Sequence, residues 1–92
     1  MTQAPYDADA LFNFPCEFPL KIMGVRSDDF SQQIVDLVLK HAPDFDPRTI
    51  EMRPSSSGTY LSLTCTIIAV SRVQLDAIYM ELSGHPLVKV AL

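Results

Sequence analysis

The strongest constraint on the fold is a long run, Thr59 to Val70, in which apolar and polar side chains alternate. A period of two residues is typical of a strand whose sheet has one buried and one open face. Residues 48–54 also alternate, and the polar turn Ser55-Ser56-Ser57-Gly58 joins them to the run, so the two segments predict a β-hairpin. The side chains expected to face inward from the run are Leu61, Leu63, Cys65 and Ile67.

Helical periodicity appears on both sides of this hairpin. Residues 30–41 carry apolar side chains at every third or fourth position, and Ser27 or Asp28 is expected to cap that helix. Residues 71–82 repeat the pattern, where Ser71 followed by Gln74 predicts a capping box. Strands are predicted at 19–25, before the first helix, and at 87–92, after the second.

The resulting order β-α-β-β-α-β predicts an α+β, ferredoxin-like sandwich: a four-stranded antiparallel sheet with two helices on one face. We expect residues 1–17 to form a flexible N-terminal segment and residues 18–92 to form the domain. Val88, Val90 and Leu92 are expected to point inward from the last strand. The open face is predicted to carry Lys21, Met23, Glu51, Arg53, Tyr60, Ser62, Thr64, Thr66 and Lys89.

Charge and cysteine content exclude several classes of function. The net charge is −4 and no cluster of Lys and Arg is visible, which disfavours binding to the phosphates of nucleic acid. Cys16 and Cys65 are too few and too far apart for a disulfide framework or a metal knuckle, so no metal or cofactor is expected. The first residues lack a signal-peptide pattern and no apolar run is long enough to span a bilayer, so a cytoplasmic location is expected.

Four segments keep a distinctive order and spacing: FPCEFPLKIMG at 14–24, KHAP at 40–43, RPSSSGTY at 53–60, and YMEL with LVKV at 79–82 and 87–90. Together they resemble the YbeD family of short bacterial proteins of unassigned function. The resemblance implies a ferredoxin-like domain similar to the ligand-sensing ACT domains, and a regulatory role with a protein partner linked to lipoate metabolism. It supplies no catalytic residues, and residues 1–13 have no counterpart in it.

A first candidate site is the loop between the first strand and the first helix. Gly24, Val25, Arg26 and Ser27 would place backbone N–H groups and a cation at the start of a helix. ACT-like domains hold a small effector in this region, usually between two subunits. The same residues also suit an ordinary strand-to-helix turn with a cap, and Asp28 and Asp29 would repel an anionic ligand.

A second candidate site is the hairpin turn, with Arg53, Ser55, Ser56, Ser57 and Tyr60 as residues expected to contact a partner. Arg and Tyr are enriched in binding hot spots, and the serines could donate several hydrogen bonds. Serine and glycine are also common turn formers, so the same composition is compatible with turn geometry alone.

The enzymatic and RNA-binding functions known for this topology fit the chain poorly. An acylphosphatase needs a water-positioning Asn in the core, but the only Asn is Asn13. An RNA-recognition domain needs stacking aromatic residues on the open face, where Tyr60 stands alone. The sequence therefore predicts a non-catalytic regulatory or adaptor domain that binds a protein partner and self-associates. The alternative is an ACT-like small-molecule sensor.

Overall fold

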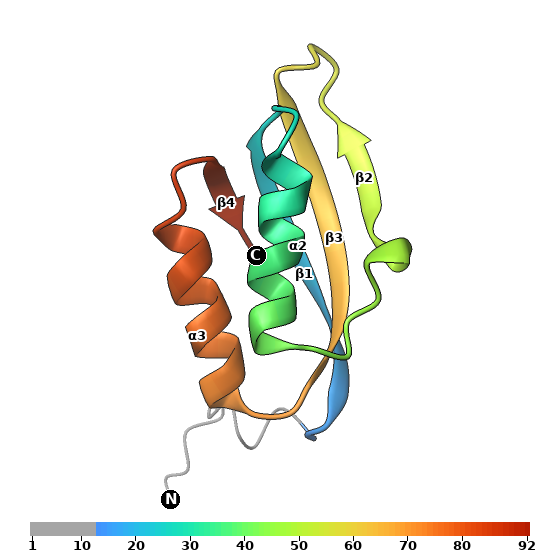
Figure 1. The fold of residues 1–92 in the computed structure, drawn as a ribbon, viewed down its shortest axis with the longest axis vertical. Helices are drawn as coiled ribbons and strands as arrows, with labels where there is room; N and C mark the ends of the chain where they lie inside the picture. The colour runs from blue at the N-terminus through green and yellow to red at the C-terminus, as the bar shows by residue number, and fades with distance from the viewer. Residues whose placement is uncertain (1–12) are drawn as a thin grey trace, which may run out of the picture.

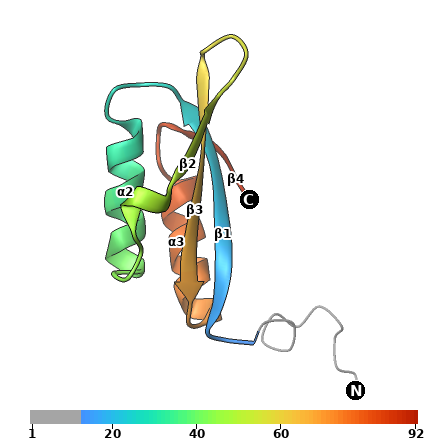
Figure 2. The same ribbon diagram turned by 90° about the vertical axis from the view of Figure 1, so that its right-hand side faces the viewer.

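The structure is a computed structural model that describes residues 13–92 as one antiparallel sheet with two helices on one face (Figures 1 and 2). The strand order β2-β3-β1-β4 confirms the predicted ferredoxin-like βαββαβ fold. The elements are β1 (Cys16–Val25), α2 (Phe30–His41), the 3-10 turn η1 (Pro47–Thr49), β2 (Glu51–Pro54), β3 (Tyr60–Ala69), α3 (Arg72–Ser83) and β4 (Val88–Ala91).

The centre of the sheet is an uninterrupted β1–β3 ladder that runs from the Cys16–Ala69 pair to the Val25–Tyr60 pair. Strand β1 begins earlier than the predicted Pro19 and reaches into the segment 1–17, most of which lies outside the described residues. Cys16 and Phe18 continue the inward alternation, and the Phe18 ring makes an edge-on contact with Tyr79 at 6.5 Å between ring centres. Apolar packing therefore extends the strand at its start.

The core lies between the sheet and the two helices. Burial raises the pKa of the Cys65 thiol to about 11, so this cysteine behaves as a small apolar core residue. Gly24 is a packing position, because a Cβ atom there would lie 2.3 Å from the Leu87 carbonyl oxygen and 2.5 Å from the Phe30 ring. The largest fully buried side chains are Phe30, Leu20, Ile22, Ile34, Leu63, Ile67, Ile78, Leu82, Val38 and Cys65.

The last strand faces differently from the prediction. Ala91 pairs with Ile22 and faces the helices, whereas Val90 pairs with Met23 on the open face. A register shift between Met23 and Gly24 leaves Lys89 as an extra residue, which is the geometry of a β-bulge. The prediction that Val90 and Leu92 point inward, and Lys89 outward on the open face, is therefore wrong.

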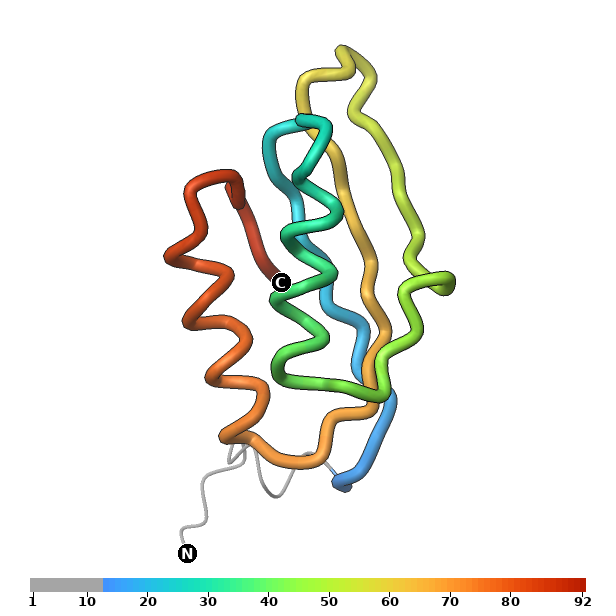
Figure 3. The backbone as a smooth tube through the Cα atoms, in the orientation of Figure 1, coloured from blue at the N-terminus to red at the C-terminus, as the bar shows by residue number. Residues whose placement is uncertain are grey.

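Side-chain contacts join the two helices to each other, and Figure 3 shows α2 and α3 lying side by side. The predicted cap at Ser71 is confirmed, since Ser71 Oγ accepts a hydrogen bond from the Gln74 backbone N–H at 3.1 Å, whereas the second bond of the predicted capping box comes from the N–H of Val70 instead of Ser71. The Gln74 side chain accepts from the Val70 N–H and donates to the His41 carbonyl, which ties the start of α3 to the end of α2. Neither helix of residues 13–92 is long and apolar enough to cross a membrane.

Helix α2 begins at a different cap from the one predicted. The N-cap residue is Asp29, and its side chain makes no capping hydrogen bond to the backbone. Instead, Asp29 accepts hydrogen bonds from Ser27 Oγ at 3.2 Å and from Gln33 Nε2 at 2.9 Å. The prediction of Ser27 or Asp28 as the cap is therefore wrong by one or two positions.

Candidate functional site

Both sequence-predicted sites meet at one end of the sheet, the end where the β2–β3 hairpin projects in Figure 1. Val25 pairs with Tyr60, and the Arg26 N–H donates to the Thr59 carbonyl at 3.0 Å. The Arg26 guanidinium lies 3.4 Å from where a Cβ of Gly58 would stand. We call this surface, residues 24–27 and 53–60, the hairpin corner. Two segments far apart in sequence thus form one surface.

Most polar groups of the turn bond to the turn itself. Ser55 Oγ accepts from the Tyr60 N–H at 3.1 Å, and Ser57 Oγ donates to Thr59 Oγ1 at 3.1 Å. Gly58 has a φ of 77°, a conformation that favours glycine. Ser55 and Ser57 therefore serve turn geometry, while Arg53, Ser56 and Tyr60 are exposed.

The predicted ligand loop is also largely committed to internal contacts. The Val25 N–H donates to the Leu87 carbonyl at 2.9 Å, and the Ser27 carbonyl accepts from the Phe30 N–H at 3.3 Å. The space beside Gly24 is filled by the Phe30 ring and the Leu87 carbonyl. Of the four predicted loop residues, Arg26 is the exposed one.

The open face of the sheet continues from the hairpin corner as two shallow hollows of about 240 and 350 Å³. Lys21, Ser62 and Thr64 line both of them. One hollow has an apolar wall that the sequence prediction missed, because Val90 and Leu92, 40% and 71% exposed, lie on this face. The other hollow is lined further by Glu51, Met52 and Arg53.

Charges are distributed unevenly over the surface. Lys40, Arg48 and Arg72 each form an ion pair, with Glu81, Asp46 and Asp76 respectively. The other four cations form no ion pair with any acid of residues 13–92: Lys21, Arg26 and Arg53 lie at the hairpin corner or on the adjoining open face, and Lys89 lies beside α3. These positive charges are available to a partner's carboxylates or carbonyls.

The histidines and acids have structural roles in the helix layer. His41 and Lys40 both contact Glu81, with the Lys40–Glu81 pair at 2.7 Å, and the hydrogen bonds from these two side chains lower the pKa of the Glu81 carboxyl. His85 accepts at Nδ1 from the Leu87 N–H and contacts Gln33 Oε1 through Nε2 at 2.9 Å. Residues 13–92 contain no group of three or more His, Cys, Asp or Glu side chains able to hold a metal ion.

A solved structure shares this fold. The solution structure of protein HP0495 from H. pylori matches all of this chain and 98% of its own, with a TM-score of 0.74 and 15% sequence identity. At that identity, the likeness supports the fold alone.

Sequence relatives cover nearly the whole chain. A UPF0250 protein of Nitrosomonas europaea is 50% identical over 84 residues, which are 91% of this chain and 97% of that protein. A UPF0250 protein of Chromobacterium violaceum is 52% identical over 82 residues, which are 89% and 92% of the two chains. The family model DUF493, "Protein of unknown function", matches residues 9–92. The resemblance to YbeD-like proteins is thereby confirmed, and the chain belongs to the DUF493 family of bacterial UPF0250 proteins.

Proposed function

We propose that this protein is a non-catalytic regulatory or adaptor domain that binds a protein partner through the hairpin corner and the adjoining open face. The carrying observation is that Lys21 and Arg53 line one hollow of the open face, Arg26 lies beside Gly58 in the turn, and none of the three forms an ion pair with residues 13–92. Three cations without an ion pair inside the described domain favour a binding partner with an acidic surface. Complementary charge speeds the encounter of two proteins and fixes their relative orientation.

Apolar side chains beside these cations support the same function. Met23, Val90 and Leu92 form an apolar wall next to Lys21, and Tyr60 stands near Arg53 on the neighbouring strand. An apolar patch rimmed by charge is typical of protein interfaces, in which a few aromatic and Arg residues supply most of the affinity. The expected partner therefore presents acidic residues around an apolar anchor.

The sensor alternative places a small molecule at Gly24, Val25, Arg26 and Ser27. The filled space beside Gly24 and the committed N–H groups of Val25 and Arg26 favour the adaptor instead. A thermal-shift screen against amino acids, lipoyl and fatty acids and nucleotides separates the two. Ligand at about 100 times its Kd adds about 2.7 kcal/mol, which at about 4–8 °C per kcal/mol in a domain of this size would raise the midpoint by about 10 °C or more.

Affinity capture with a double variant tests the adaptor function. Arg53→Glu combined with Tyr60→Ala should remove the captured partner while thermal unfolding remains that of the parent, since both side chains are exposed. Arg48→Glu is a control for charge reversal, because it reverses the charge of an exposed Arg that lies outside the hairpin corner, on η1. We expect this control to capture the partner normally.

Two results would contradict the proposal. Equal capture by the double variant and the parent would remove the hairpin corner as the binding surface. Equal loss by the double variant and by Arg48→Glu would show a non-specific charge effect. Capture that weakens with added salt in the parent alone supports charge complementarity, because exposed charges are screened over about 8–10 Å at physiological ionic strength.

A further inference from the structure

The two edge strands of the sheet, β2 and β4, differ in the charged residues and prolines that they carry. Strand β2 at one edge carries the charged Glu51 and Arg53 and ends at Pro54, which has no N–H group to donate. Strand β4 at the other edge has no proline, and its single charged residue, Lys89, is the bulged one, so Val90 and Ala91 follow it without a charge or a proline. Edge strands without such protection present unpaired backbone groups that another strand can bind.

Hydrogen bonds within the sheet indicate which backbone groups of β4 are free. Lys21 and Leu92 exchange both of their backbone hydrogen bonds, at 3.1 and 2.8 Å. Because residues of an antiparallel strand alternate between facing their neighbour and facing away, the N–H and C=O of Ala91 point to the outer edge. No strand of residues 13–92 lies on that side.

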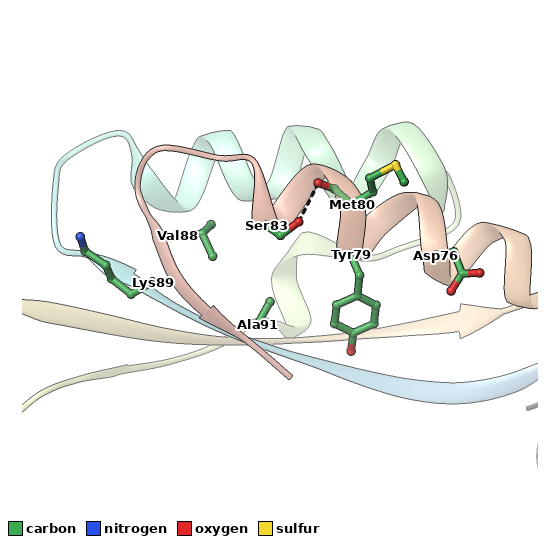
Figure 4. Close-up of a pocket in the computed structure, with 7 residues that line it drawn as sticks. All are labelled: Asp76, Tyr79, Met80, Ser83, Val88, Lys89 and Ala91. Atoms are coloured by element: carbon green, nitrogen blue, oxygen red, sulfur yellow. Dashed lines mark hydrogen bonds between the residues drawn. The ribbon is translucent and has the colours of Figure 1, made fainter. Parts of the chain in front are cut away.

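Beside this edge lies a hollow of about 660 Å³ between α3 and β4 (Figure 4). Its middle is apolar: Met80 is 76% exposed, and the Tyr79 ring points from α3 toward the sheet near Ala91. Its two ends carry opposite charges. Lys89 stands at one end and Asp76 at the other, with the apolar side chains between them.

We propose that this hollow and the β4 edge bind a second copy of the same chain about a two-fold axis near Ala91. Rotation by 180° sets each β4 antiparallel to the other and brings Lys89 of one copy to Asp76 of its partner, twice. A surface that is positive at one end, apolar in the middle and negative at the other is complementary to itself under this rotation, as an isologous interface requires. The sheet then continues across both copies, and the exposed Met80 side chains become covered.

The charges at this edge can form the intermolecular pairs. Lys89 has no ion pair within residues 13–92, and Asp76 has only an exposed contact with Arg72 at 3.8 Å. This edge lies opposite the β2–β3 hairpin, so the hairpin corner stays uncovered in the dimer, although Val90 of the same strand also lines the open-face hollow.

Charge exchange between two variants tests this assembly, with sedimentation velocity or light scattering over a range of concentrations as the readout. Lys89→Asp alone brings two acids together at each contact, and Asp76→Lys alone brings two lysines together. We expect each variant to dimerise at least tenfold more weakly than the parent. When the two variants are mixed in equal amounts, every contact joins a lysine to an aspartate, so dimers of one copy of each should return.

Three results of this experiment would overturn the proposed dimer. A parent that stays monomeric at millimolar concentration overturns the proposal and leaves an extended peptide of another protein as the occupant to consider. Single variants that associate like the parent, or a mixture that fails to recover, also overturn it. Arg53→Glu should leave dimerisation unchanged. Affinity capture with Lys89→Asp and Asp76→Lys tests the proposed function separately, because it measures binding of the protein partner and not dimerisation.

Discussion

The two faces of the sheet carry alternate side chains of the same strands, one face buried beneath the helices and the other open. Leu63 on β3 is fully buried beneath the helices, while its neighbour Thr64 faces the open side and lines two shallow hollows. Ile22 and Lys21 on β1 show the same contrast. The buried face holds the fold together through apolar packing, whereas the open face carries the cations that we assign to a partner.

This division implies that substitutions on the two faces should separate stability from binding. Buried positions should affect unfolding strongly, because cavities and clashes there cannot be relieved by solvent. Open-face positions should affect binding with little effect on unfolding. The following predictions test this separation, from the largest effect to the smallest.

The largest loss is expected for Leu63→Ala. Removing a fully buried leucine side chain leaves a cavity beneath the helices, which should lower the free energy of unfolding by about 2–5 kcal/mol. Chemical denaturation measures this value. Thr64→Ala is the matched control on the open face and should change stability by less than about 0.5 kcal/mol. Equal losses at the two positions would refute the division between the faces.

Gly24→Ala adds atoms to the buried face instead of removing them. The new Cβ would meet a backbone oxygen at 2.3 Å, which cannot move aside as a flexible side chain would. We expect a loss of about 1–3 kcal/mol in a denaturation experiment, accompanied by shifted amide resonances near Phe30 and Leu87. A variant as stable as the parent would show that this end of the sheet can open, and would revive the sensor alternative.

Ser71→Ala tests how the helix layer is attached. Losing the hydroxyl that accepts the Gln74 N–H should cost about 0.5–2 kcal/mol. Ser71→Asp keeps an accepting oxygen at the cap and should retain most of the stability. If both variants lose the same amount, the hydrogen bond at the cap is not the cause.

The smallest effect is expected at the half-buried Glu81, and it depends on pH. Hydrogen bonds from Lys40 and His41 lower the pKa of this carboxyl in the folded protein, so its contribution is present above the ordinary carboxylate pKa of about 4.3 and disappears as the pH falls through the folded value. Glu81→Gln should flatten that acidic part of the stability profile. Thermal unfolding between pH 7 and pH 3 measures the difference.

Alternation and helical spacing predicted the fold class, because both helices and the central strands bury one face each. The stripe of Phe30, Ile34 and Val38 and the cap at Ser71 stand where the sequence placed them. The facing of β4 was not predictable by the same rule. A bulge inserts one residue into the pairing, and nothing in the alternation of Val88 to Leu92 reveals it.

The candidate site was predicted only in pieces. The loop at Arg26 and the hairpin at Arg53 are both visible in the sequence, but their contact depends on the β1–β3 register, which pairs Val25 with Tyr60. Val90 and Leu92 lie on the open face because the bulge shifts the register of β4. Local patterns therefore identified the chemical groups, while long-range pairing decided which of them share a surface.

The position of β1 has a consequence for how the chain folds during synthesis. Of the four strands this one is made first, yet its two neighbours in the sheet, β3 and β4, begin 35 and 63 residues after it ends. Sheets built from such distant pairings fold more slowly than sheets of local hairpins, because a large loop must close before any pair forms. On the ribosome, the backbone of β1 must wait without a strand partner until β3 emerges, and the sheet is complete only when β4 has left the exit tunnel.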